Sequence, residues 1–459
     1  MESASAKTAE ILIDGAWVRA GTALQRAVIN PATLVPICSV PECSAEEVAA
    51  AAGAARRSLS GWASRSAVDR AALLEQAGRE ILRETAQLAD LHARETGQVC
   101  CESLDAVRAA AAYFRKAAQS LAAGNASLSG SKALCGGCVA AVVISPEYPL
   151  LDWAHAASRL LALGSTLVCM PPLGSPLTIL AAAACLDALP AGVINVLTVS
   201  EDVTHILNQI PGIDHVAAGR GAAHSTDAVF ISETADLDLA VAGAASLRLF
   251  HSGQRRGQST CIHVAQAIAD PFTDRLHEFI AFLEAGDPCK RGTDLGPLTS
   301  LATLTRVEDA VGRALRQGAR LKLGGRRYQP WGLPGYFFQP TILIDRSEHG
   351  SAGDDCIAGP VVILSPVRDI AVAISHGHRR GVRSVLALFA RDPAVQLRAV
   401  EAAAPGVRTR EPLRAVERIC ERIEQRVSGM DHLVVELIAS RQPDWFPYHR
   451  RPPQPAGDT

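Results

Sequence analysis

Short apolar runs alternate with helix-forming stretches between residues 138 and 219, and this alternation constrains the fold more than any other feature of the 459-residue sequence. The apolar runs are typical of buried strands: CVAAVVIS, STLVCM, GVINVLTV and DHVAAG. Two intervening stretches, LLDWAHAASRLLALG and SPLTILAAAACLDAL, have the length and apolar content of helices. The pattern predicts an α/β fold with a parallel, doubly wound sheet, an architecture that binds dinucleotides at its carboxyl edge.

Other signals extend this prediction to the rest of the chain. Ser44 followed by Glu47 forms a capping box at a helix start, and residues 67–95 carry apolar side chains at helical spacing. A second α/β block follows residue 224. From residue 411 the strand pattern stops, and a proline-rich tail follows an apolar helical stripe formed by Leu413, Val416, Ile419, Ile423 and Val427.

The charge balance argues against two classes of partner. The chain has 45 Lys and Arg residues against 47 Asp and Glu residues, a net charge of -2, which gives no electrostatic reason to expect nucleic acid or an anionic membrane. The sequence starts without a basic segment followed by an apolar run, and it contains no apolar stretch long enough to span a membrane. We therefore expect a soluble, cytoplasmic protein of two or more domains.

The cysteines do not indicate a disulfide framework or a metal site. The sequence has 12 of them without regular spacing, which is typical of reduced thiols in core positions. Cys135 and Cys138 form one local pair in CGGC, but no second pair with matching spacing completes a set of metal ligands. We expect no metal.

Two loops are candidates for binding and chemistry. GRGAAHS, residues 219–225, follows an apolar run but has only two of the three glycines of a dinucleotide fingerprint, with His224 at the third place, so a surface turn is the simpler interpretation. FHSGQRRGQSTCIHV, residues 250–264, contains a single cysteine, Cys261. Whether Cys261 is a nucleophile depends on the register of this loop.

Over residues 10 to 410 the sequence resembles the aldehyde dehydrogenase superfamily, with landmarks in family order: ILIDGAWV, INPAT, ARETGQ, LPAGVINVLT, TADLDLAV, DLGPLTS, GYFFQPTIL and GPVVILSPV. The resemblance implies a Rossmann-like cofactor domain (residues 1–119 and 139–240), an oligomerisation arm (120–138), a catalytic-type domain (241–410) and a divergent terminus (411–459). It also implies a reaction in which a cysteine attacks an aldehyde, hydride passes to NAD or NADP, and a glutamate-activated water releases the acid.

The same resemblance places Arg256 where the family has its nucleophilic cysteine, because Phe250, Gly253, Gln254 and Val264 fit the family's loop without a gap. Arginine stays protonated and has no lone pair to attack a carbonyl. Cys261 falls five residues after that position, at the start of the next strand, so we expect a packing role. As a nucleophile it would require the loop to slip by several residues.

Further positions depart from the family pattern. Glu147 stands at the place of the oxyanion-stabilising amide, and the segment that supplies the general base is deleted. Met170 and Leu173 replace two side chains that contact the adenosine ribose, Arg220 replaces a small residue under the phosphates, and Cys356 replaces the glutamate at the nicotinamide ribose.

These departures favour a catalytically dead pseudoenzyme without a cofactor. Such a protein would serve as a structural or regulatory partner of an intact aldehyde dehydrogenase, or would pair with itself. Two alternatives stay open. One is an NAD(P)-dependent aldehyde oxidoreductase with residual or altered activity. The other is a binding module that holds another ligand in an apolar crevice beside Met170.

Overall fold

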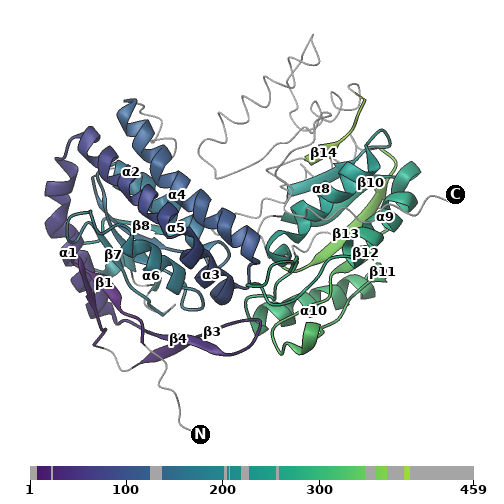
Figure 1. Ribbon diagram of the computed structural model, residues 1–459, viewed down its shortest axis with the longest axis horizontal. Coiled ribbons are helices and arrows are strands. Elements are labelled where there is room, and N and C mark those ends of the chain that lie inside the picture. Colours follow the sequence, from purple (N-terminus) through teal and green to yellow (C-terminus); the bar gives the residue numbers. More distant parts are fainter. Residues whose placement is uncertain are drawn as a thin grey trace, which may run out of the picture. The chain divides into compact units, whose positions relative to one another are not determined.

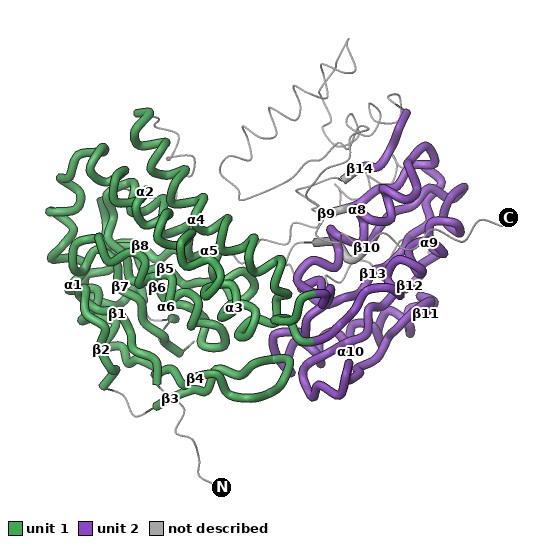
Figure 2. The backbone as a smooth tube through the Cα atoms, in the orientation of Figure 1, with its two compact units in different colours: residues 1–221, 287–291 green, residues 222–286, 292–459 purple. Residues whose placement is uncertain are grey.

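The computed structural model describes residues 8–21, 24–124, 137–200, 204–205, 207–218, 227–254, 258–346, 357–369 and 387–392. It divides the chain into two compact units (Figures 1 and 2). Unit 1 comprises residues 1–221 and 287–291, and unit 2 comprises residues 222–286 and 292–459. Each unit contains a six-stranded sheet, and helices pack against the sheets, so the predicted α/β class is confirmed.

The sheet of unit 1 has the order β2-β1-β7-β6-β5-β8. Its four parallel strands are the predicted apolar runs: β5 (Val139–Val143), β6 (Thr166–Met170), β7 (Ile194–Val196) and β8 (His215–Ala218). Every residue of β6 is buried, as expected for a strand covered on both faces. The antiparallel strands β1 (Ile11–Ile13) and β2 (Ala16–Val18) extend the sheet at one edge.

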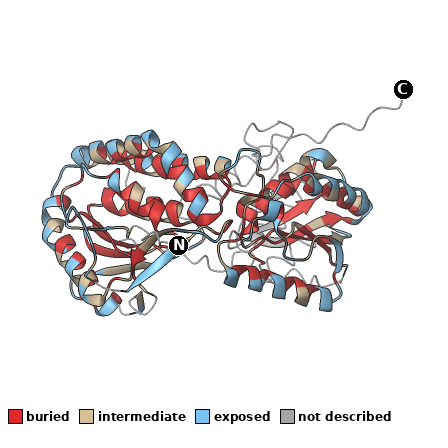
Figure 3. Ribbon diagram, turned by 60° about the horizontal axis from the view of Figure 1, so that its bottom comes forward, coloured by how far each residue is buried: buried red, intermediate tan, exposed pale blue. Residues whose placement is uncertain are grey.

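Helices cover both faces of this sheet (Figure 1). They are α1 (Ala45–Ala63), α2 (Ala67–Arg83), α3 (Thr85–Thr96), α4 (Cys100–Ala122), α5 (Pro149–Ala162) and α6 (Leu177–Ala184). The capping box predicted at Ser44 and Glu47 is present at the start of α1. One core cluster includes Trp62, Phe114 and Trp153, and a second, on the other face, includes Val48, Val139 and Val168. Figure 3 shows the buried residues on the strands and the inner sides of the helices.

The sheet of unit 2 has the order β11-β12-β13-β10-β9-β14. Its strands are β9 (Asp227–Ile231), β10 (Gln258–Ala265), β11 (Arg320–Leu323), β12 (Thr341–Ile344), β13 (Val361–Val367) and β14 (Ala387–Phe389). The longer helices of this unit are α8 (Leu237–Leu249), α9 (Ala269–Ala281) and α10 (Leu301–Arg316). Parallel pairing of β10 with β9 and β13 puts β10 in the middle of the sheet.

The units divide at residue 221, whereas the sequence placed the first domain boundary at residue 240. The reason is that β9 pairs with β10 and β14, so residues 227–240 fold with the second sheet. Of the predicted arm, residues 125–136 lie outside the described residues, as does the whole terminus from residue 411. No helix in the described part of the chain is both long and apolar enough to cross a membrane.

Two leucines on α2 test this description of the core. Leu74 is fully buried, whereas Leu82, two turns later, is 37% exposed. We expect Leu74→Ala to lower the free energy of unfolding by about 2–5 kcal/mol, because it removes buried methyl groups and leaves a cavity. Leu82→Ala, the matched control, should cost much less. Urea unfolding of both variants measures the difference, and equal costs would contradict the packing of α2.

Candidate functional site

The carboxyl edge of the parallel strands in unit 1 contains a topological switch point. The chain runs from β5 to β6 and β7 on one side, then returns to place β8 on the other side of β5. Val143 is in register with both Met170 and Ala218, so the three strands end at the same level. In open α/β sheets, ligands bind in the crevice outside the strand ends at such a point.

Glu147 lies in the turn between the end of β5 and the start of α5. Its backbone N–H donates to Ser145 Oγ at 3.5 Å, and its side chain is partly buried. Helix α5 follows with Pro149 at its first position, and no side chain caps its N-terminus. The structure therefore places Glu147 at the carboxyl edge of the sheet, just after β5. A carboxylate there accepts hydrogen bonds but cannot donate one to a developing oxyanion.

Met170 and Leu173 contribute to packing within unit 1. Met170 is 1% exposed and belongs to the core cluster that contains Val139 and Val168. Leu173, three residues after the end of β6, packs partly buried against a small cluster with Val28 and Val40. Met170 thus forms part of the core and does not line a crevice. In the sequence, these two residues replace side chains that contact the adenosine ribose in the family. In the structure, both pack against apolar neighbours of unit 1.

The loop that contains Leu173 ends at the start of α6, and a side chain of α3 binds this helix start. Glu95 of α3 accepts hydrogen bonds from the backbone N–H groups of Leu177 and Thr178, at 2.8 and 2.7 Å, and from the hydroxyl of Thr178. Pro176, the residue at the N-cap, makes no side-chain cap. Glu95 therefore satisfies two of the N–H donors at the start of α6 and fixes the end of the loop of residues 171–176.

Burial shifts the pKa values of two neighbouring groups on α3 in opposite directions. Burial raises the pKa of Glu95 to about 7, although its hydrogen bonds to Thr178 and Leu177 oppose the shift. Burial lowers the pKa of His92 to about 4, against the opposing effect of its hydrogen bond to Gln98. The ring Nε2 of His92 lies 3.0 Å from Gln98 Oε1. Both residues are at least 97% buried, so a charge on either one would be shielded from water.

In unit 2, the loop that precedes Arg256 begins with an unusual backbone. His251 and Ser252 have φ values of 50° and 51°, and Gly253 follows with 69°. Left-handed conformations are costly for residues other than glycine and persist only where surrounding contacts impose them. At Gly253 a Cβ atom would lie 2.1 Å from the Gly359 carbonyl oxygen, so only glycine fits. Ser252 Oγ donates to Gly296 O at 2.8 Å.

Arg248 supplies much of this constraint from the last turn of α8. Its guanidinium donates to Gly253 O at 3.0 Å, Ile357 O at 2.6 Å and Gly359 O at 2.9 Å. Only 2% of the residue is exposed. Gln254 adds a contact, because its Oε1 accepts from Thr299 N at 2.9 Å. Arg248 therefore joins the start of the loop to the segment that leads into β13.

Cys261 is a residue of β10, as the family register predicted. It pairs with Ile363 of β13 and is 4% exposed. Its Sγ lies 3.9 Å from His263 Nδ1, and the His263 ring stacks on Phe230. A slip that moved Cys261 into the loop would turn every side chain of β10 to the opposite face of a sheet paired on both sides. The strand position favours packing.

Three predicted site residues lie outside the described residues: Arg220, Arg256 and Cys356. The glycine loop of residues 219–225 and Cys135 of the CGGC pair also lie outside them. The roles inferred for these positions stay predictions. Glu95 and Arg248, in contrast, were not singled out from the sequence. Arg248 left a usable signal, since it is a charged residue in the apolar helix LDLAVAGAASLRL.

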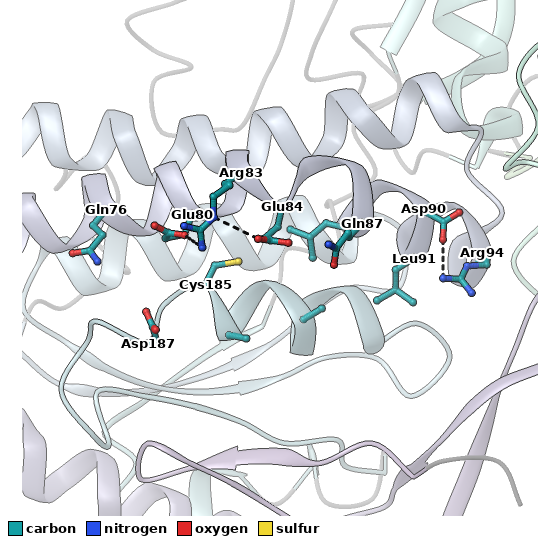
Figure 4. A pocket seen from close by; sticks show the side chains of 13 residues that line it. Gln76, Glu80, Arg83, Glu84, Gln87, Asp90, Leu91, Arg94, Cys185 and Asp187 are labelled. Carbon is teal, nitrogen blue, oxygen red and sulfur yellow. Dashed lines mark ion pairs between the residues drawn. The ribbon is translucent and has the colours of Figure 1, made fainter.

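A groove of about 700 Å³ lies elsewhere in unit 1, between α2, α3 and the second half of α6 (Figure 4). Ion pairs join Arg83 to Glu80 and Arg94 to Asp90 along its wall. Burial, and next the charge of Glu84, raises the pKa of Cys185 in this groove to about 11, so the thiol is a poor nucleophile. Because the groove is lined by the end of α6 and not by its start, it is separate from the loop fixed by Glu95.

Comparisons with known proteins agree with this architecture. A model of the aldehyde dehydrogenase family matches residues 17–219 and 223–407. The chain is 27% identical over 439 residues to succinate-semialdehyde dehydrogenase [NADP(+)] of Escherichia coli (strain K12), covering 87% of this chain and 88% of that protein. It is also 27% identical over 409 residues to lactaldehyde dehydrogenase of the same strain, covering 82% and 84% of the two chains.

Solved structures show the same fold. Lactaldehyde dehydrogenase from Escherichia coli superposes with a TM-score of 0.77 at 24% identity, covering 87% of this chain and 90% of that chain. An NADP-dependent enzyme of Escherichia coli superposes with a TM-score of 0.77 at 26% identity, covering 88% and 90%. The NAD+ complex of an aldehyde dehydrogenase from Bacillus cereus gives 0.77 at 22% identity, covering 86% and 87%.

One expectation from the sequence is wrong. The replacements at Met170, Leu173, Arg220 and Cys356 led to the prediction of a protein without a cofactor. The relatives named above include one that uses NADP(+) and one solved with NAD+. The loss of individual side-chain contacts does not by itself remove a cofactor site. The strand order that forms a switch point, the place where open α/β sheets bind ligands, is present in unit 1.

The opposite pKa shifts of Glu95 and His92 generate a prediction about stability. The raised pKa of Glu95 stabilises the fold at low pH, and this contribution is lost as the pH rises from about 4.5 through about 7. The lowered pKa of His92 stabilises the fold above about 6.5, and this contribution is lost as the pH falls through about 4. Between pH 4.5 and 6.5 the two therefore oppose each other.

Glu95→Gln should remove the first contribution and leave the second. We expect the difference in the free energy of unfolding between the original protein and the variant to change by about 2 kcal/mol from pH 4.5 to 6.5, with the original losing its advantage as the pH rises. Urea unfolding at several pH values measures it. Glu10→Gln, at an exposed position, is the control. A difference that is constant across this range would show that Glu95 titrates in the same way in both states.

A second prediction concerns Arg248. Lysine carries a compact ammonium group and cannot reach three carbonyl oxygens as a guanidinium fork does. We expect Arg248→Lys to destabilise unit 2 by about 1–3 kcal/mol, because buried carbonyl groups lose their donors. Arg275→Lys is the control, since Arg275 is exposed and pairs with Asp238 at the surface. Calorimetric unfolding measures the loss of stability in both variants. Equal losses would show that Arg248 does not stabilise the loop through its three carbonyl contacts.

Proposed function

Because the chain belongs to the aldehyde dehydrogenase family, we propose that it is an NAD(P)-dependent aldehyde oxidoreductase with residual or altered activity. The observation that carries the proposal is the switch point of unit 1, where Val143, Met170 and Ala218 end at one level on adjacent parallel strands. The relative that is named for NADP(+) matches 87% of the chain, which supports the same cofactor class here.

The residues at this edge fit a dinucleotide. The turn from Ile144 to Tyr148 leads into α5, whose N-terminus has no side-chain cap, so backbone N–H donors are directed at this edge of the sheet. The loop of residues 171–176 is fixed at both ends, by the hydrogen bond from Ile144 N to Met170 O at 3.0 Å and by Glu95 at the start of α6. These segments would hold the nucleotide mainly through backbone groups. The bound cofactor would supply the acceptor for the hydride of an aldehyde.

The activity is altered because the family's cysteine route lacks its residues at the matching positions. Arg256 cannot form a covalent bond to the carbonyl carbon, and Glu147 would repel negative charge that develops on the carbonyl oxygen. Cys261, the nearest thiol that follows, is buried in β10. Turnover therefore falls well below that of a member with an intact cysteine, since each such group contributes about 10²-fold or more to the rate.

The same residues favour a second candidate function. A family member that binds NAD(P) but no longer turns over aldehydes would act as a structural or regulatory partner, in a heteromer with an intact aldehyde dehydrogenase or as a homodimer. The specific observation is that Arg256 and Glu147 stand at the two family positions and that the segment between residue 225 and Arg256 is shortened. Native mass spectrometry of the endogenous complex identifies the partner. Finding only the monomer would contradict this candidate.

One experiment separates the two candidates. Calorimetric titration with NAD+ and NADP+ measures binding, and absorbance of the reduced nucleotide measures its production from short aldehydes and semialdehydes. Binding with slow, aldehyde-dependent reduction supports the oxidoreductase. Binding without reduction supports the second candidate, the structural or regulatory partner. Saturable binding of neither nucleotide would overturn the proposed function.

Arg256→Cys tests whether the nucleophile alone limits the rate. We expect this variant to produce no more reduced nucleotide than Arg256→Ala. The family position of the oxyanion-stabilising amide would still be held by Glu147, the loss of such a donor costs about 3 kcal/mol in the barrier, and no glutamate from the deleted segment would activate water to release a thioester. Steady production above the Arg256→Ala control would show that the remaining site is competent.

A further inference from the structure

Two cysteines meet where the chain returns to unit 1. Residues 287–291, which we call the strap, fold with unit 1 although the residues on both sides of them belong to unit 2. The strap carries Cys289, and helix α4 begins with Cys100. We propose that Cys100 and Cys289 are a redox-active dithiol that a small-molecule disulfide converts to an intrachain disulfide bond, fixing the strap to the start of α4.

The backbone brings the two residues within range of a bond. Cys100 N donates to Pro288 O at 2.8 Å. Standard bond lengths put that oxygen about 2.8 Å from the next Cα and the nitrogen about 1.5 Å from its own, so the Cα atoms of Cys100 and Cys289 lie no more than about 7 Å apart. Disulfides join Cα atoms about 4.4–6.8 Å apart. Within the strap, Cys289 N donates to Asp287 Oδ1 at 3.0 Å, which shapes the turn that carries Cys289.

Access distinguishes this pair from most of the other thiols. Cys100 and Cys289 are both partly exposed, whereas Cys43, Cys138, Cys169, Cys185 and Cys261 are buried. A disulfide reagent can therefore reach either partner of the pair without unfolding the core. The neighbouring Cys101 is exposed and provides an internal comparison, because successive helix residues point in different directions.

The chemistry is two successive thiol–disulfide exchanges. The Cys100 thiolate attacks one sulfur of the small disulfide, forms a mixed disulfide and releases one thiolate, which takes up a proton. The Cys289 thiolate then attacks the Cys100 sulfur of the mixed disulfide, forms the Cys100–Cys289 bond and releases the second thiol. Two protein thiols are oxidised, and one small disulfide is reduced to two thiols, so electrons and protons balance.

The surroundings of Cys289 set the rate of the second exchange. Burial, and next the charges of Asp287 and Asp90, raise the pKa of Cys289 to about 12, while Arg94 opposes the shift and Cys100 adds to it. Only a small fraction of this group is thiolate near neutral pH, and the attacking species in exchange is the thiolate. Closure should therefore become faster as the pH rises.

Peptide mapping of the folded, full-length protein tests the proposal. The protein is incubated with oxidised glutathione at pH 7 and pH 9, unreacted thiols are blocked, and peptides are identified by mass spectrometry without reduction. We expect a linked peptide pair that contains Cys100 and Cys289, formed faster at pH 9 and lost on addition of a dithiol reductant. Because the bond closes a long loop, the thermal midpoint of the oxidised protein should rise by several degrees.

Serine variants provide the controls. Cys100→Ser and Cys289→Ser should each abolish the linked peptide and the rise in midpoint, while Cys101→Ser should keep both. Serine is close in size to cysteine, and circular dichroism checks that each variant is folded. A bridge through Cys101, or glutathione that stays on Cys100 without closure at either pH, would overturn the proposal. The outcome does not depend on whether the protein oxidises aldehydes.

Discussion

The parallel pairing of β5 with β6 on one side and β8 on the other is the constraint on which unit 1 depends. Val139 to Val143 align with Thr166 to Met170 over five consecutive positions. The strand is composed of valine and alanine only, so small apolar side chains let helices pack on both faces. The same pairing creates the switch point, because the chain changes direction across β5. The pairing of β5 with β6 and β8 thus determines both the sheet of unit 1 and the position of the candidate site.

Two buried ionisable side chains fix the conformation of loops that follow the regular elements. Glu95 holds the start of α6, which sets the end of the loop after β6. Arg248 holds the start of the loop after α8 and the approach to β13. In each case a charged group inside the protein is directed at backbone groups that a helix end or a strained turn leaves without partners. In each unit, the conformation of a loop therefore depends on a hydrogen bond between residues far apart in the sequence.

The sequence could predict the elements that arise from local patterns. The apolar runs gave the parallel strands, and Ser44 with Glu47 gave the start of α1, because both signals lie within a few residues. It could not predict the break between α2 and α3 at Glu84, since no glycine or proline marks it. Nor could it place β9, whose sheet is decided by pairing with β10, a strand that starts 31 residues after Asp227 in the chain. Glu95 was inaccessible for the same reason: its partners lie 82 and 83 residues away.

Hydrogen–deuterium exchange with and without NADP+ or NAD+ tests whether a nucleotide binds at the carboxyl edge of the sheet in unit 1, as we propose, because backbone amides report the place of binding. We expect slower exchange at saturating nucleotide in residues 144–152, around the start of α5, and in residues 173–178, around the start of α6. Unchanged exchange in both segments, or protection confined to the groove beside Cys185, would contradict this proposal.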